Sequence, residues 1–374
     1  MFRPLPAALA LATALATPLA TPLCAQDSFA ELQQKFRSEA RELGAKMPTR
    51  EQQDALLTRH IGELSAFVTR AQGNDRWNGR LMLADLLLIR GERDKAKEAL
   101  GGIDEKQAPA LLLVSAAAMA PHAGLPQLRE RWINLAMERE APLEDRLAIA
   151  RLLTLSLHEI DRGEMVFQKE LAAAKDDETR ALIRFHRADT MRDREDLADN
   201  AGWEELERVA KDLPGTYWGS VARDRMRAVQ LRPNDAAIPF TAKTTDGKQV
   251  SLAGAAGKVL VLVFWVVDDH DNAALWTELR ALRKKHGEKL EVLAVNLDRE
   301  LPMVTKAITE QDIDVPVIAD GKGIFNDVAL RWFVEGPGVY VVGPTGKVEG
   351  LRLFVGTNDG RRELEDAITR AVPK

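Results

Sequence analysis

The sequence predicts an all-α region followed by an α/β domain. From residue 28 to about residue 231, apolar residues recur at helical spacing, as Ile61, Leu64 and Phe67 do. After Pro233 the pattern changes to short β-branched runs that alternate with helical stretches, which is typical of a sheet covered by helices. A chain of 374 residues is long enough to hold two such domains, each with its own core.

The N-terminus has the pattern of an export signal. A short positive start ends at Arg3, an apolar Ala/Leu-rich stretch follows, and small residues mark a cleavage site after Ala25. The apolar stretch is too short to span a membrane. A lipoprotein would use Cys24, but Leu23 stands where lipoprotein signals want a small residue. We therefore expect residues 1–25 to be removed and the protein to be periplasmic or secreted.

Charge and cysteine content exclude several classes of function. The net charge of −5 favours neither nucleic acid nor an anionic membrane surface as a partner. Cys24 is the sole cysteine, so a chain cleaved after Ala25 has no disulfide, no thiol nucleophile and no cysteine metal ligand.

Residues 26–232 are predicted to form an array of helical hairpins. The phrase LADLLLIRGERDKAKEAL resembles one tetratricopeptide-like unit, with Gly91 where its first helix should end. The run 108–120 is apolar all round and too short for a bilayer, which predicts a buried helix at the centre of the array. The other predicted helices are Asp145–His158, Glu164–Lys175, Asp177–Met191, Trp203–Leu213 and Tyr217–Val229.

Residues 233–374 are predicted to be the α/β domain, with Pro233 and its polar neighbours at the boundary. A hairpin around Asp246–Gly247 opens it. In chain order we then expect a buried strand Val259–Val267, a helix Ala273–His286, a strand Leu290–Leu297, a helix Pro302–Gln311, a strand Val315–Ala319, a helix Ile324–Phe333, a hairpin of Gly338–Val342 with Lys347–Phe354, and a helix Asp359–Ala371.

This second domain resembles the thioredoxin-like redoxins, in particular the TlpA-like thiol-disulfide oxidoreductases and the AhpC/TSA family. The resemblance rests on IPF with TTDGKQVSL, on GKVLVLVFW, on VNLD, and on VEGPGVYVV, which follow one another in the family's order. It implies a thioredoxin-like fold, with a functional turn after Trp265. It also implies that Pro337 is the family's cis-proline, opposite that turn.

The turn departs from the family at the residues that carry its chemistry. The resemblance puts Asp269 and Asn272 where the two cysteines of the family stand. Thiol-disulfide exchange needs an attacking thiolate and a second thiol that resolves the mixed disulfide, and a carboxylate supplies neither. We expect Asp269 instead to cap the helix that follows, because its oxygens can accept hydrogen bonds from the first-turn N–H groups.

We expect a binding site around this turn rather than a catalytic one. Its candidate residues are Trp265, Asp268, His270, Asp271, Gly336 and Pro337. A metal site using Asp269, His270 and Asp271 is an alternative, although adjacent residues lack the usual spacing of metal ligands.

The sequence thus predicts an exported protein that has kept a redoxin fold and lost its cysteines, and that binds an envelope protein or peptide without a cofactor. Two rivals stay open: a non-thiol enzyme that uses the Asp-His-Asp turn, and a structural spacer. The oligomeric state does not follow from the sequence.

Overall fold

The computed structural model describes residues 28–44, 48–198 and 200–372, and the expected export signal with Cys24 lies outside them. The chain divides into two compact units, one ending at Gly202 and the other beginning at Trp203. This boundary lies before residue 232, where the helical pattern in the sequence ends. The last two helices of that pattern therefore fall in the second unit. These helices are α11 (Ala201–Asp212) and α12 (Tyr217–Gln230), and α12 packs on α15 (Asp327–Trp332).

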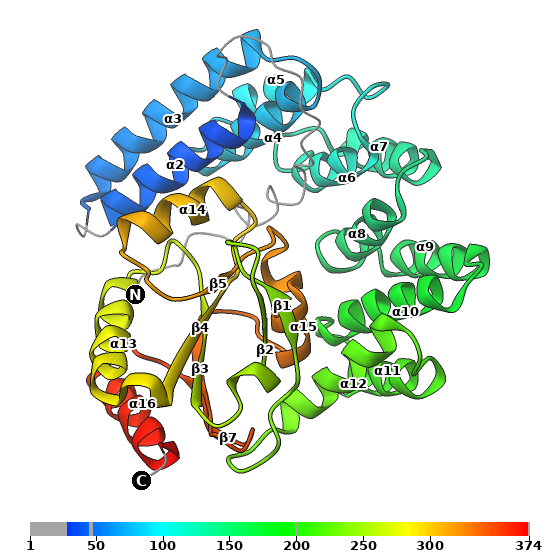
Figure 1. The fold of residues 1–374 in the computed structure, drawn as a ribbon. Coiled ribbons are helices and arrows are strands. Elements are labelled where there is room, and N and C mark those ends of the chain that lie inside the picture. The colour runs from blue at the N-terminus through cyan, green and yellow to red at the C-terminus, as the bar shows by residue number, and fades with distance from the viewer. Residues whose placement is uncertain (1–27, 45–47, 199, 373–374) are drawn as a thin grey trace. The chain divides into compact units, whose positions relative to one another are not determined.

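The first unit consists of helices that pack mainly against their neighbours in the chain (Figure 1). They are α2 (Phe29–Gly44), α3 (Arg50–Arg70), α4 (Gly73–Ile89), α5 (Arg93–Gly101), α6 (Ala110–Met119), α7 (Pro126–Glu138), α8 (Leu143–Leu155), α9 (Ile160–Ala173) and α10 (Asp177–Arg192). Local signals set their ends: Thr49 and Gln52 form a capping box at α3. Gly91, with φ +82°, turns the chain between α4 and α5.

Helix α6 is the buried centre that the apolar run predicts. Residues Ala110 to Ala117 are all buried, and all of them except Ser115 belong to an apolar core that extends from Phe29 to Ile183. A helix that is apolar on every side needs such surroundings, since no face of it suits water.

The second unit is built on a five-stranded mixed sheet with the strand order β5-β4-β3-β6-β7 (Figure 1). Strand β3 (Val259–Trp265) pairs in parallel with β4 (Leu290–Asn296), which pairs in parallel with β5 (Val317–Ile318). On its other side β3 pairs antiparallel with β6 (Gly338–Val342), which pairs antiparallel with β7 (Val348–Leu353). All seven residues of β3 are buried, so the strand is covered on both faces.

Alternate residues of β3 serve two different cores. Val261, Val263 and Trp265 pack against α13 (Asn272–His286), α14 (Leu301–Glu310) and α16 (Asn358–Ala371). Leu260, Leu262 and Phe264 face α15 (Asp327–Trp332) and Ala228 of α12. A short hairpin, β1 (Thr241–Lys243) and β2 (Gln249–Ser251), turns at Gly247 with φ +85° as its Asp-Gly pair predicts.

The predicted fold class is confirmed: a helical region precedes an α/β domain whose elements follow the order expected from the sequence. Within the described ranges, no helix is both long enough and apolar enough to cross a membrane.

Candidate functional site

The candidate site is the turn between β3 and α13, at the carboxyl end of the central strand. Residues 266–271 leave the sheet here, beside the carboxyl end of the parallel strand β4. In open α/β sheets this edge is the usual place for a functional site, because the strand ends and the helix N-terminus leave polar backbone exposed together.

Asn272 ties the turn to the sheet. It is 4% exposed, and its side-chain amide donates hydrogen bonds to the backbone carbonyls of Val266 at 2.9 Å and Val267 at 3.2 Å. A buried amide satisfied in this way has a structural role, since it pairs carbonyls that no strand or helix serves. The residue at the second cysteine position therefore closes the turn.

Asp269 stabilises the turn and not the helix itself, which corrects the predicted capping role. Its Oδ1 accepts a hydrogen bond from the backbone N–H of Asp271 at 3.0 Å, and Asp271 precedes the first helical residue. The Asn272 N–H donates to the Asp269 carbonyl at 3.3 Å, so an additional turn separates Asp269 from α13. The helix begins too late in the chain for the Asp269 carboxylate to reach its first-turn N–H groups.

A second polar network lies behind the turn. Asp298 Oδ2 accepts from the Val267 N–H at 2.7 Å and from the side-chain amide of Asn296 at 2.8 Å. Asn296 is 1% exposed, and its Oδ1 accepts in return from the Asp298 N–H. The ends of β3 and β4 are thus joined by side chains as well as by the strand ladder.

Pro337 lies opposite the turn, as the resemblance implies. The Gly336–Pro337 peptide is trans, which corrects the cis bond that the resemblance implies. Pro337 shares a depression of about 30 Å³ with Asp269, Asp271 and Asn272. That volume holds about one water molecule. The surface here is therefore shallow, and we refer to this depression as the groove.

The other predicted site residues lie at different depths. Trp265 is completely buried and packs edge-on against Trp276 at 5.4 Å, so it supports the groove from below. Asp268, His270 and Gly336 do not line the depression. His270 has an 88% exposed side chain whose ring nitrogens lie 3.6 Å from Asp269 Oδ1 and 3.4 Å from Asp271 Oδ2.

The predicted alternative, a metal site, has three ligand atoms within 4.8 Å of one another, from Asp269, His270 and Asp271. The side chains are drawn together by the extra turn, although they are consecutive in sequence. Carboxylate oxygens with an imidazole suit zinc or another divalent cation.

Four residues of the site were missed from the sequence. Asn296 and Asp298 had a usable signal, since polar residues directly after a buried parallel strand point to the functional edge of the sheet. Phe354 and Gly356 had none. Phe354 lines the depression yet is 53% exposed, and a Cβ on Gly356 would collide with the Asp271 carboxylate. These contacts depend on the path of the chain after β7.

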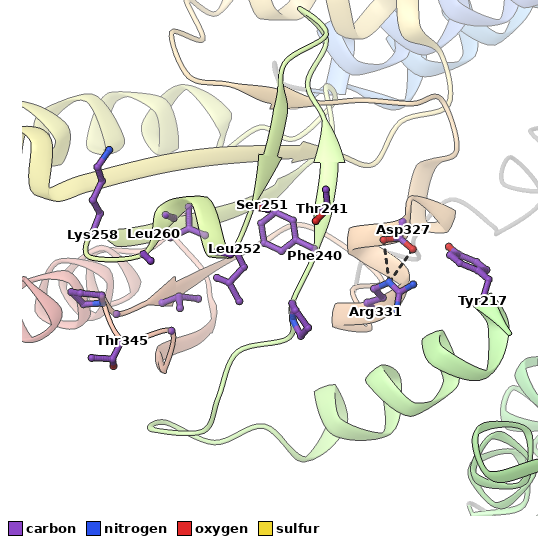
Figure 2. Close-up of a pocket in the computed structure, with 18 residues that line it drawn as sticks. Tyr217, Phe240, Thr241, Ser251, Leu252, Lys258, Leu260, Asp327, Arg331 and Thr345 are labelled. Atoms are coloured by element: carbon purple, nitrogen blue, oxygen red, sulfur yellow. Dashed lines mark hydrogen bonds and ion pairs between the residues drawn. The ribbon is translucent and has the colours of Figure 1, made fainter. Parts of the chain in front are cut away.

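A larger cavity of about 840 Å³ lies at the other end of β3 (Figure 2). Its lining includes Lys258 and Leu260 of that end, and the strand separates it from the turn by roughly 20 Å. The floor is mainly apolar, with Phe240 and Leu252, and Tyr217, Asp327 and Arg331 form its polar end. Burial and a hydrogen bond to Asp327 raise the pKa of Tyr217, so its hydroxyl stays protonated at neutral pH.

Comparisons with known proteins find relatives and solved structures that each match about two fifths of this chain. Thioredoxin-like protein YneN of Bacillus subtilis (strain 168) is 26% identical over 156 residues, which are 41% of this chain and 88% of YneN. A candidate thiol:disulfide interchange protein DsbE from Chlorobium tepidum is 23% identical, with 38% of this chain and 99% of that chain covered and a TM-score of 0.35. The thioredoxin domain of thiol-disulfide oxidoreductase BVU-2223 from Bacteroides vulgatus is also 23% identical, with 37% and 99% covered and a TM-score of 0.31.

The sequence model of the AhpC/TSA family matches residues 233–350. This range begins just after α12 and contains β1 to β6 and part of β7, together with the turn and Pro337. The second unit therefore has a thioredoxin-like fold, and its residues 233–350 are similar to the AhpC/TSA family.

Proposed function

We propose that the protein is exported to the cell envelope and binds an extended segment of a partner protein or peptide, without thiol chemistry. The observation that carries this proposal is the use of Asp269 and Asn272 within the turn. Both side chains form hydrogen bonds to the backbone around them, in the places where a redoxin of this type holds its two cysteines.

The argument against thiol chemistry is chemical. The sole cysteine, Cys24, precedes Asp269 by 245 residues (269 − 24) and belongs to the segment we expect to be removed. Disulfide exchange and thiol-dependent peroxide reduction both require a thiolate at the site. A carboxylate can hold a charge there, but it cannot form the mixed disulfide.

The shape and composition of the groove support binding of an extended chain. Pro337 and Phe354 both line it, both are exposed, and together they offer apolar contact area. The depression is too small for a ligand of drug size. Recognition of an extended peptide needs only a shallow track with polar backbone nearby and places for side chains.

The test is a binding measurement with a blocked groove. Gly336 has no atom within 4 Å of the place where a Cβ would stand, so the Cβ of Gly336→Trp has space, and the variant adds a large side chain beside Pro337. Gly215 is equally open, and Gly215→Trp is the matched control. The probe is a fluorescein-labelled, reduced and alkylated insulin B chain, followed by fluorescence anisotropy.

We expect the wild type and Gly215→Trp to bind the probe alike, and Gly336→Trp to bind about tenfold more weakly. Equal binding by all three proteins would overturn the proposed site, as would no binding by the wild type. Turnover of disulfides or peroxides by the cysteine-free mature protein would overturn the proposal as a whole. The mass of the protein recovered from the cell envelope tests export and cleavage after Ala25.

The cluster of Asp269, His270 and Asp271 favours one second candidate, a divalent-metal site. Zinc titration followed by calorimetry separates the two proposals, with His270→Ala as the comparison. Stoichiometric zinc binding that His270→Ala abolishes would support the metal site. Equal heats for both proteins would exclude it.

A further inference from the structure

We propose that helices α11 and α12 hold the loop that carries Pro337, and that Arg225 and Trp203 are positioning residues for the groove. The effect of these contacts on binding rests on the proposed function. Whether α11 and α12 hold the loop can be tested separately. It gives a role within the redoxin-type unit to two helices that precede the residues matched by the family.

Arg225 of α12 contacts the C-terminal end of α15. Arg225 is only 6% exposed, and its Nε donates a hydrogen bond to the Leu330 carbonyl at 3.2 Å. The guanidinium also lies over the ring of Phe333, 5.2 Å from the ring centre. A cation suits this place because the last carbonyls of a helix carry partial negative charge, and burial strengthens both contacts.

The contacts of Arg225 fix Phe333. It has φ +49°, in the left-handed region, where a bulky side chain is strained. Such a conformation persists when the surroundings determine it. The Trp203 ring of α11 also packs edge-on against Phe333, with 5.1 Å between ring centres and 81° between planes.

The left-handed turn at Phe333 sends the chain into the Pro337 loop. The Val334 N–H donates back to the Ala329 carbonyl at 2.9 Å, and four residues later Gly338 enters β6 beside Phe264. The loop is therefore held at both ends, by the sheet after Pro337 and by the Arg225–Phe333–Trp203 stack before it. Movement at the stack would change the distance between Pro337 and the turn.

A second set of contacts fixes α12 along α15. Arg331 Nη1 contacts Asp224 Oδ2 at 2.7 Å and Ser220 Oγ at 3.1 Å. The side chains of Arg331 and Asp224 are only 15% and 8% exposed. The Arg331 guanidinium lies 5.3 Å from the centre of the Tyr217 ring, and Figure 2 shows Tyr217 facing Asp327 and Arg331 across this junction. Loss of one partner from such a buried pair is costly, so the two helices behave as one body.

The experiment compares the full chain with Arg225→Ala and Trp203→Ala. Hydrogen exchange by mass spectrometry reports on the segment 333–341, and anisotropy with the labelled insulin B chain reports on binding. Trp203→Phe keeps an aromatic edge against Phe333 and serves as the rescue. Val348→Ala, in the same core but away from the stack, is the control for general destabilisation.

We expect exchange in 333–341 to rise about tenfold in both alanine variants, with probe affinity falling by a similar factor, and Trp203→Phe to restore both. In Val348→Ala any increase should spread over the sheet. Unchanged exchange in 333–341, or an increase spread as in Val348→Ala, would overturn the inference. If the wild type fails to bind the probe, the proposed function is wrong. The exchange data still show whether α11 and α12 hold the loop.

Discussion

The side-chain amide of Asn272 donates a hydrogen bond to the backbone carbonyl of Val266, over 2.9 Å. This bond joins the first residue of α13 to the first residue after β3, across the whole turn. A thiol at this position would leave both the Val266 and Val267 carbonyls without this donor. The turn is therefore built around an amide.

Asn272→Ala should destabilise the second unit by about 1–3 kcal/mol, because it removes the amide that donates to the Val266 and Val267 carbonyls. Denaturant unfolding gives the free energy, and hydrogen exchange over residues 266–275 shows where the loss occurs. Asn134→Ala removes an exposed amide that contacts Glu130 at 3.4 Å, and it should change stability by less than about 0.5 kcal/mol. If the two variants unfold alike, the amide does not hold the turn.

Asp85→Asn should stabilise the first unit at neutral pH. Burial in α4 raises the pKa of Asp85 above 3.8, so the folded state binds the proton more tightly than the unfolded state does. Stability from this group is thus full below pH 3.8 and is lost as the pH rises through the folded-state pKa. The neutral amide avoids that loss, and we expect a gain of roughly 0.5–2 kcal/mol at pH 7.

Thermal unfolding at neutral and at acid pH checks this effect. The gain should disappear in acid, where the wild-type carboxyl is already neutral. The exposed Asp54 on α3 provides the control, Asp54→Asn, for which no such gain is expected. A gain in acid equal to that at neutral pH would show that charge is not the cause.

The packing of α2 on α3 should weaken as the pH falls below about 6.5. His60 is buried, stacks on Phe36 with 4.0 Å between ring centres, and bonds Glu39 at 2.8 Å. Burial lowers the pKa of His60 below 6.5, and Glu39 offsets only part of this shift. Because the unfolded state then binds the proton more readily, this contribution to stability is present above pH 6.5 and is lost on acidification.

The measurement is the unfolding temperature of wild type and His60→Gln at about pH 7.5 and pH 5.5. The difference between the two proteins should shift in favour of His60→Gln as the pH falls. Parallel behaviour of the two proteins would mean that His60 does not titrate in this range.

The fold was predictable because its strongest patterns are local. The apolar run Val259–Val267 identified the central strand, and the uninterrupted apolar stretch around Leu112 identified the buried helix α6. The association of α12 with the sheet was not predictable. It depends on Arg225 reaching Leu330 and on Arg331 reaching Asp224, which lie more than a hundred residues apart in sequence.

The site was predictable in position and less so in detail. The resemblance located the turn and Pro337 together, and the structure places both around one depression. The additional turn at Asp269 could not be predicted, because helix N-cap residue types occupy every position from Asp268 to Asn272 except 270. The helix could therefore begin at any of several residues in this segment of the sequence.

Cysteines introduced at positions 269 and 272 should not create a redox site. In Asp269→Cys/Asn272→Cys the first thiol would stand three residues before the first residue of α13, so the N–H groups that lower the pKa of a catalytic thiol would lie out of reach. The carboxylates of Asp268 and Asp271 nearby would disfavour a thiolate further. We expect the pKa of this thiol to be at or above the ordinary value of about 8.5, and insulin reduction to stay at the level of Asp269→Ser/Asn272→Ser. Alkylation by iodoacetamide as a function of pH gives the thiol pKa directly. A thiolate that forms below neutral pH, with insulin turnover above the serine control, would mean that the helix can extend back to residue 269 and that the extra turn follows from the aspartate itself.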